Sequence, residues 1–286
     1  MTLTCMPRLF CYTYLQDIRN KKEKREWYDM PVRGGRAMQK IIKDKLKEIE
    51  EKENVTILMA VESGSRAWGF ASPDSDYDVR FIYVREKEDY LRLDTVRDVI
   101  DWQLDDVLDI NGWDVKKALQ LMHNSNPTIF EWCESPIVYR TSEAFEQMKQ
   151  LRKAYFSPKK SLYHYLHMAE SNYKKFLQCD QIKVKKYFYV LRPILAAKWI
   201  AAKKIWPPML FSELMEAELE EDLKPETERL LVMKKEMDEM ELVPGNQKIN
   251  AYVESNLEKF KKLADDMPKT ETSWDSLNRY FRSLIL

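Results

Sequence analysis

The feature that most constrains this chain is an apolar run of strand length that leads into a glycine–serine turn. Residues 55–61 are almost entirely apolar and partly β-branched, which is typical of a strand buried on both faces. Gly64 and Ser65 follow, and a second strand opens with Asp76 and Asp78. Because these aspartates are two residues apart in an extended chain, both carboxylates face the same side. The segment therefore predicts two strands joined through a turn, with carboxylates at a strand end.

The turn and the aspartates suit complementary parts of one ligand. Gly64 permits close approach, Ser65 adds a hydroxyl, and N–H groups at the start of the short helix expected over 66–70 point toward an anion. The carboxylates of Asp76 and Asp78 repel each other unless a divalent cation lies between them, and Mg²⁺ prefers carboxylate and phosphate oxygens. We therefore expect Mg²⁺, or Mn²⁺, beside a bound phosphate. A purely polar hairpin is the alternative, which the strand–turn–strand frame disfavours.

Two aspartates later in the chain, Asp109 and Asp114, are candidates to join this carboxylate pair. On the strand expected over 106–111, alternation places Leu108 and Ile110 toward the core and leaves Asp109 on the polar face. Asp114 begins the next helix, where capping and the helix dipole suffice to explain it. We favour Asp109 and keep Asp114 as the alternative.

These residues resemble a known signature. The blocks 64–70 and 72–80 look like that of the DNA polymerase beta superfamily of nucleotidyltransferases. More narrowly, the chain resembles the RNA-repair-pathway, or RNA-ligase-associated, family of predicted nucleotidyltransferases. The resemblance extends over roughly 38–210, and its further matching blocks are 109–114, 125–127, 131–132, 135–139, 186–187 and 191–193.

The resemblance implies an α+β fold, in which a small mixed-sheet nucleotidyltransferase domain precedes a helical domain. The implied reaction transfers a nucleoside monophosphate from a nucleoside triphosphate to a hydroxyl acceptor, an RNA end among them, and releases pyrophosphate. Asp76, Asp78 and Asp109 would bind metal and act in catalysis, while Gly64 and Ser65 would hold phosphates.

Several cations are candidates for nucleotide contact. Arg66 and Arg80 lie beside the motif, where they could meet phosphates or pair with the carboxylates. The helix expected over 183–204 carries lysines, arginine and aromatic residues without an acidic residue, which suits a triphosphate or a nucleic-acid backbone. Its Lys186 and Arg192 join Arg66 as nucleotide-binding candidates. The alternative is a core helix with a solvated basic face.

Composition bounds the remaining possibilities. Lys+Arg and Asp+Glu both total 47, so nucleic-acid contact would depend on a local patch. The four cysteines are scattered, which favours reduced thiols, and no apolar stretch is long enough to span a membrane. We expect a cytoplasmic protein.

The chain is expected to have three parts. We predict a poorly ordered extension over 1–37, a catalytic domain over 38–145 and a helical domain over 146–286, and Met38 is a candidate natural start.

Two other functions remain open. A regulatory or antitoxin-like module would keep the fold and bind nucleotide without catalysis. An enzyme could also use the same metal site to hydrolyse a nucleotide. Transfer of label from a nucleoside triphosphate to an acceptor would distinguish the predicted nucleotidyltransferase from both alternatives.

Overall fold

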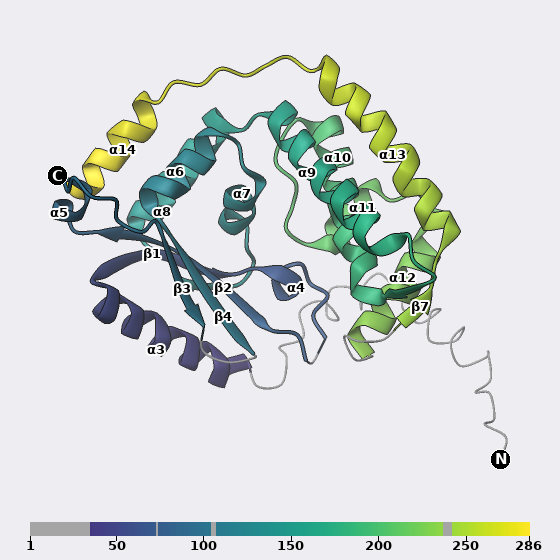
Figure 1. Cartoon of the computed structure of the whole chain (residues 1–286), viewed down its shortest axis with the longest axis horizontal. Coiled ribbons are helices and arrows are strands. Elements are labelled where there is room, and N and C mark those ends of the chain that lie inside the picture. The colour runs from purple at the N-terminus through teal and green to yellow at the C-terminus, as the bar shows by residue number, and fades with distance from the viewer. Residues whose placement is uncertain (1–34, 73, 104–106, 237–241) are drawn as a thin grey trace. The chain divides into compact units, whose positions relative to one another are not determined.

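A five-stranded mixed sheet lies at the centre of the first half of the chain (Figure 1). The computed structural model describes residues 35–72, 74–103, 107–236 and 242–286, so the predicted extension over 1–37 falls almost wholly outside the described residues. Residues Lys40–Leu286 form one compact unit. The strands are β1 (Val55–Glu62), β2 (Tyr77–Arg85), β3 (Val99–Gln103), β4 (Leu108–Asp114) and β5 (Val138–Arg140).

The strand order is β3-β4-β2-β1-β5, and β2 and β4 form its parallel pair. In that pair Asp78 lies opposite Asp109, so the two carboxylates start from adjacent positions on neighbouring strands. Leu108 and Ile110 are buried and Asp109 is exposed, as the alternation predicted. β4 continues to Asp114, however, beyond the predicted end at residue 111, because its pairing with β2 persists to that position.

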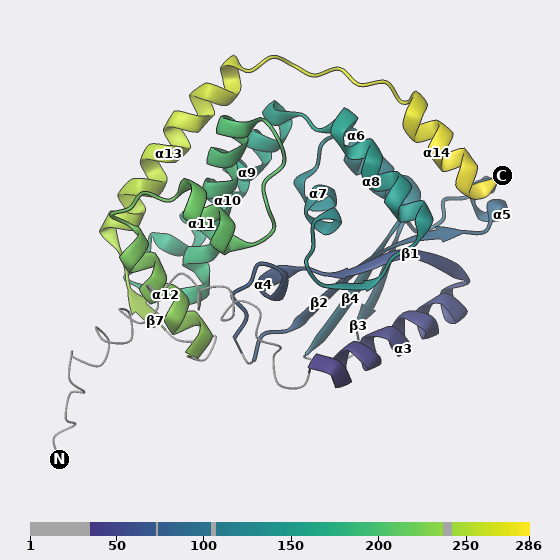
Figure 2. The same cartoon turned by 180° about the vertical axis from the view of Figure 1, so that it is seen from behind.

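Helices cover both faces of the sheet. The helices of the first half of the chain are α3 (Gly35–Glu53), α4 (Gly64–Ala67), α5 (Lys87–Tyr90), α6 (Val115–His123), α7 (Pro127–Cys133) and α8 (Glu143–Tyr155). Figures 1 and 2 show α6 and α8 on one side of the sheet and the Lys40–Glu53 part of α3 on the other. Ile42, Leu46 and Ile49 of α3 recur at helical spacing and are completely or almost completely buried.

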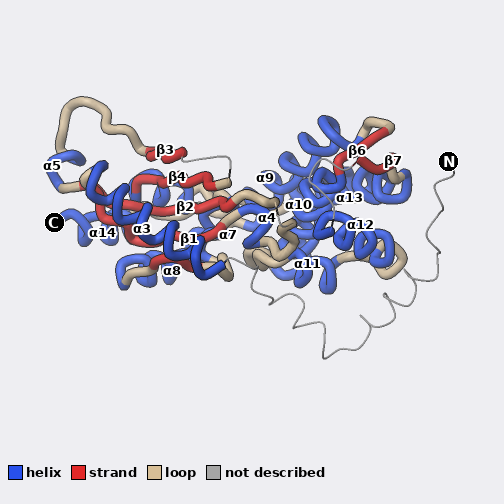
Figure 3. The backbone as a smooth tube through the Cα atoms, turned by 90° about the horizontal axis from the view of Figure 1, so that it is seen from below, coloured by secondary structure: helices blue, strands red, loops and turns tan. Residues whose placement is uncertain are grey.

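The second half of the chain is mainly helical. Its elements are α9 (Pro158–Asn172), the π-helix η1 (Tyr173–Leu177), β6 (Gln181–Lys183), α10 (Val184–Lys203), α11 (Phe211–Glu218), α12 (Lys224–Glu236), β7 (Leu242–Pro244), α13 (Gln247–Asp266) and α14 (Asp275–Ile285). The fold class is therefore the predicted α+β arrangement, a mixed sheet followed by helices (Figure 3). No helix among the described residues is both long and apolar enough to cross a membrane.

Two hydrophobic cores hold these halves. α10 is the centre of the helical core, with Tyr187, Leu191 and Leu195 all fully buried. The sheet core also takes in Leu277 and Tyr280 of α14, so the last helix packs with the first half of the chain. The division after residue 145 stays a prediction.

Candidate active site

Gly64 lies directly against Asp78. Its φ is +58°, which favours glycine, and a Cβ added there would lie 2.0 Å from the Oδ2 atom of Asp78. The Ser63 N–H donates to the Asp78 carbonyl oxygen at 2.8 Å, which ties the turn to β2. The first turn of the short helix α4, which begins at Gly64, leaves N–H groups without intrahelical acceptors. The backbone N–H groups at the start of α4 and the Asp78 carboxylate therefore lie side by side.

Arg80 joins the carboxylates of two strands. One of its terminal nitrogens lies 2.8 Å from Asp78 Oδ1 and 2.8 Å from Asp109 Oδ2, and the other donates to the Asp109 carbonyl oxygen at 3.0 Å. Of the two roles open to Arg80, pairing with carboxylates is the one observed. The Asp109 side chain is 58% exposed and that of Arg80 17%, so the group lies at the surface of the sheet. Burial raises the pKa of Asp78 above its ordinary value, and Arg80 opposes that rise.

Arg66 holds the segment that carries Asp76. Its guanidinium donates to the carbonyl oxygens of Ser75 at 2.6 Å and Asp76 at 3.1 Å, and it stacks on the ring of Tyr77 at 3.7 Å. The contacts described for Arg66 are therefore with backbone carbonyl oxygens and an aromatic ring, and not with a carboxylate. Asp76 itself is exposed. The structure brings Gly64, Asp76 and Asp78 into one region, as the motif predicted.

Asp114 has a structural role. Its side chain accepts the Lys116 N–H at 2.8 Å as the N-cap of α6, and it accepts the Tyr90 hydroxyl at 2.8 Å. It lies opposite Tyr83, five positions along β4 from Asp109. The geometry therefore favours Asp109 over Asp114 as the carboxylate that joins Asp78.

Glu62 belongs to this region and was missed in the sequence. It is fully buried at the end of β1, its Oε1 accepts the Asp78 N–H at 2.8 Å, and its other oxygen accepts the Tyr139 hydroxyl. Burial raises its pKa to about 7. The sequence did indicate this role, because a glutamate ends an apolar strand beside a glycine turn. A buried acid requires polar partners, so such a residue is expected to bond to its surroundings.

Arg192, one of the two α10 cations expected to contact the nucleotide, is held by another side chain. Arg192 is 3% exposed and donates to Glu131 at 2.8 Å, an oxygen that also accepts the Tyr165 hydroxyl at 2.6 Å. A phosphate would have to displace Glu131 to reach Arg192, so we remove it from the proposed nucleotide contacts. Lys186 is half-buried over the rings of Phe176, at 3.9 Å, and Tyr189, at 4.8 Å.

The donor set suits a magnesium ion once Arg80 moves. Among the described residues, no three His, Cys, Asp or Glu side chains already surround a cation position. Arg80 instead supplies the positive charge between Asp78 and Asp109. Asp76, Asp78 and Asp109 offer carboxylate oxygens, which Mg²⁺ prefers as ligands. Gly64 has no Cβ that would crowd Asp78. Rotation of one partly exposed side chain would open the position.

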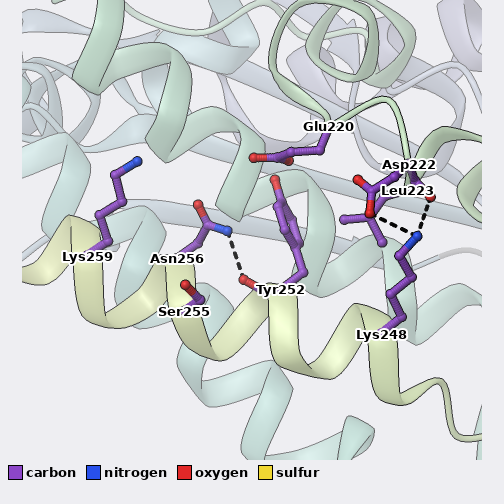
Figure 4. A pocket seen from close by; sticks show the side chains of 8 residues that line it. All are labelled: Glu220, Asp222, Leu223, Lys248, Tyr252, Ser255, Asn256 and Lys259. Carbon is purple, nitrogen blue, oxygen red and sulfur yellow. Dashed lines mark hydrogen bonds and ion pairs between the residues drawn. The ribbon is translucent and has the colours of Figure 1, made fainter.

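A separate pocket of about 320 Å³ lies in the helical half, between α13 and residues 220–223 (Figure 4). Lys248 pairs there with Asp222 at 2.9 Å, and Lys198 pairs with Glu220 at 2.7 Å beside Tyr252. None of the predicted site residues lines this pocket. Because these charges already pair with one another, the pocket adds nothing to the candidate active site.

Comparison with known proteins finds a family whose model matches most of the sequence. The model of the RNA repair pathway DNA polymerase beta family matches residues 38–283. The uncharacterized protein YcgL of Bacillus subtilis (strain 168) is 47% identical over 253 residues, which cover 87% of this chain and 96% of that protein. A crystal structure of a nucleotidyltransferase-like protein from Exiguobacterium sibiricum 255-15 aligns with 78% of this chain and 74% of its own, at 11% identity and a TM-score of 0.29, a similarity too low to bear on the site.

Proposed function

The chain belongs to the RNA repair pathway DNA polymerase beta family, and from this premise we propose that it is a metal-dependent nucleotidyltransferase. The family makes it a polymerase beta-like nucleotidyltransferase in the general sense. The proposed reaction transfers a nucleoside monophosphate from a nucleoside triphosphate to a hydroxyl acceptor. RNA ends are the acceptors to test first, in keeping with the description of the family.

The observation that carries the proposal is the juxtaposition of Asp78, Asp109 and the turn at Gly64. Asp78 and Asp109 occupy opposite positions on parallel strands, and Gly64 approaches Asp78 more closely than any residue with a side chain could. Carboxylates beside unpaired backbone N–H groups suit a metal–triphosphate ligand, since the carboxylates bind the cation and the N–H groups bind the phosphates.

The residues would divide the work as follows. Asp76, Asp78 and Asp109 would hold Mg²⁺ or Mn²⁺, which when bound neutralises charge that develops on the triphosphate. The N–H groups of Gly64 and Ser65, with the Ser65 hydroxyl, would orient the β- and γ-phosphates. Arg66 keeps the chain at Asp76 in place through its two carbonyl contacts.

Asp109, whose side chain is more exposed than that of Asp78, would accept the proton of the acceptor hydroxyl. The acceptor oxygen forms a bond to the α-phosphorus as the bond to the pyrophosphate oxygen breaks. Asp109 is suited to this step because 58% of its side chain is exposed to the solvent from which an acceptor arrives.

The test is transfer of label from each α-labelled nucleoside triphosphate to RNA, protein and small-molecule acceptors, with Mg²⁺ or Mn²⁺. We expect Asp78→Asn and Asp109→Asn each to lower the rate by at least about 100-fold. Asp94→Asn is the control, because Asp94 is exposed and pairs only with Arg92 among the contacts described for it. Equal transfer by the wild type and by Asp78→Asn would contradict the proposal.

One observation favours the non-catalytic alternative. Arg80 already neutralises Asp78 and Asp109 without a metal ion, as it would in a module that binds nucleotide and transfers nothing. Calorimetric binding of a nucleoside triphosphate, with neither label transfer nor pyrophosphate release under any metal tested, would favour that module. Pyrophosphate release without transfer of label to an acceptor would indicate hydrolysis instead.

A further inference from the structure

Lys234 is a buried lysine that lies close to the segment before Asp76. The sequence motif around Gly64, Asp76 and Asp78 does not predict this. It lies on α12 in the helical half of the chain and is 3% exposed. Its Nζ donates to the Ser72 hydroxyl at 2.6 Å, across 162 residues of sequence, and lies 3.5 Å from the Ser75 hydroxyl. Lysine is rarely buried to this degree unless its charge is held by polar partners. The contact thus joins α12 to the segment that leads into β2.

Ser72 and Ser75 are both buried and bond to each other beside this ammonium group. The Ser75 N–H donates to the Ser72 carbonyl oxygen at 3.1 Å, and the Ser72 N–H donates to the Ser75 hydroxyl at 3.0 Å. The two hydroxyls are 2.9 Å apart, and the residues are 1% and 3% exposed. A second cation reaches the same turn from α4, where Arg66 binds the Ser75 carbonyl oxygen at 2.6 Å. Two cations from the two halves of the chain, Arg66 and Lys234, therefore hold Ser72 and Ser75.

Asp76 follows this turn directly. The Arg66 guanidinium binds the Asp76 carbonyl oxygen as well as that of Ser75, so the backbone is held on both sides of the Asp76 side chain. A catalytic group needs such support because a displacement of about 1 Å can lower a rate by about 100-fold. The side chain of Asp76 is itself exposed, so the fixed part is its backbone.

We propose that Lys234 is a positioning residue that fixes Ser72 and Ser75, and thereby the backbone that presents the Asp76 carboxylate to the metal. The role rests on the proposed function, because it matters to catalysis only if Asp76 binds the metal. It also makes the helical half part of the active-site support, through a direct contact and not only through the hydrophobic core. Lys234 touches neither metal nor substrate in this scheme.

The experiment compares Lys234→Met, which keeps length and removes the charge, with Lys224→Met. Lys224 lies on the same helix and pairs with Glu221 at the surface, so it controls for the loss of a lysine from α12. Hydrogen exchange, Mn²⁺ titration and steady-state kinetics are measured on both variants and on the wild type. Lys234→Arg is added, because a longer cation restores the charge and should restore part of each property.

We expect Lys234→Met to speed exchange of the Ser72 and Ser75 amides by about 10-fold or more while exchange in α10 and β4 stays as in the wild type. The dissociation constant for Mn²⁺ should rise about 10-fold and kcat should fall about 10- to 100-fold, with the KM for the nucleoside triphosphate within about 2-fold. Lys224→Met should match the wild type in all three.

The exchange measurement separates failure of this proposal from failure of the proposed function. If the wild type neither binds Mn²⁺ nor transfers label, the proposed function fails; exchange that loosens only at the turn then still supports the role of Lys234 in fixing it. Unchanged turn exchange in Lys234→Met overturns the proposal. Where the wild type binds Mn²⁺ and transfers label, loosening without any change in Mn²⁺ affinity or kcat overturns it as well. Exchange that rises throughout the helical half, with kcat and KM altered together, assigns Lys234 a merely structural role.

Lys234→Met has to fold for this comparison, so Ser72→Ala provides a second route. It removes the acceptor of the 2.6 Å hydrogen bond and leaves α12 unchanged. We expect the same local loosening at the Ser75 amide and the same direction of change in Mn²⁺ affinity. A folded Ser72→Ala protein with wild-type exchange and wild-type Mn²⁺ binding overturns the proposal independently.

Discussion

Two arginine–carboxylate groups in this chain share their chemistry and differ in their surroundings. Arg80 joins Asp78 and Asp109 on the open face of the sheet, and the side chain of Asp109 is 58% exposed. Arg192 of α10 meets Glu131 of α7, and the two side chains are 3% and 12% exposed. Water can replace the partners in the first group, and it cannot readily do so in the second. An exposed pair is therefore free to exchange its arginine for a metal ion, while a buried pair is fixed by the cost of leaving a charge unpaired.

The largest expected effect is on the buried pair. Arg192→Met should lower the free energy of unfolding by about 3–5 kcal/mol, because it leaves Glu131 buried without its cation. Urea denaturation measures the loss. The double variant Arg192→Met, Glu131→Met should recover much of it, since no charge then remains buried. A single variant as stable as the wild type would mean that the pair is not buried in solution.

Gly64→Ala tests the turn beside the exposed group. An alanine at φ +58° costs about 1–2 kcal/mol, and its Cβ would meet Asp78 Oδ2 at 2.0 Å. Asp78 must then move, so label transfer should fall by about 100-fold. Gly69→Ala is the matched control, because Gly69 also has positive φ, +84°, but its Cβ would meet only the side chain of Leu210, at 3.2 Å. Equal loss of transfer in both variants would point to general strain.

Arg80→Met should change stability least. Its two ion pairs are partly exposed, so we expect the free energy of unfolding to change by no more than about 1 kcal/mol. Mn²⁺ should bind more tightly, because the competing guanidinium is gone from between Asp78 and Asp109. Titration of the wild type and the variant with Mn²⁺ measures this. Weaker binding in Arg80→Met would show that Arg80 helps to hold the site together and does not compete with the ion.

Sequence patterns predicted the structure correctly where it depends only on residues close together in the chain. The apolar run before Glu62 forms β1, and the alternation around Asp109 gives a strand with Leu108 and Ile110 buried. Asp114 caps a helix, as its position suggested. In each case the residue type, its neighbours and the strand or helix period act over a few residues, so tertiary context had little to change.

Patterns failed where a partner comes from a distant segment. Arg192 was a candidate for nucleotide contact because it lies on a basic helix with aromatic residues. The sequence of such a helix does not show which of its cations are buried. Its partner Glu131 lies on α7, 61 residues earlier. Glu62 and Lys234 were missed for the same reason, because their importance depends on Asp78 and Ser72, to which they are joined only after folding.

The sequence by itself determined the family, the α+β class and the placement of Gly64, Asp76 and Asp78 on one strand–turn–strand unit, because local periodicity fixes which side chains share a face. Only the tertiary structure decided which cation stands beside which anion. It placed Arg80 at the open carboxylates, sealed Arg192 against Glu131, and brought Lys234 under the turn before Asp76. The physical reason is that the energy of a charge depends on its burial and on its partners, and both are properties of the packed chain.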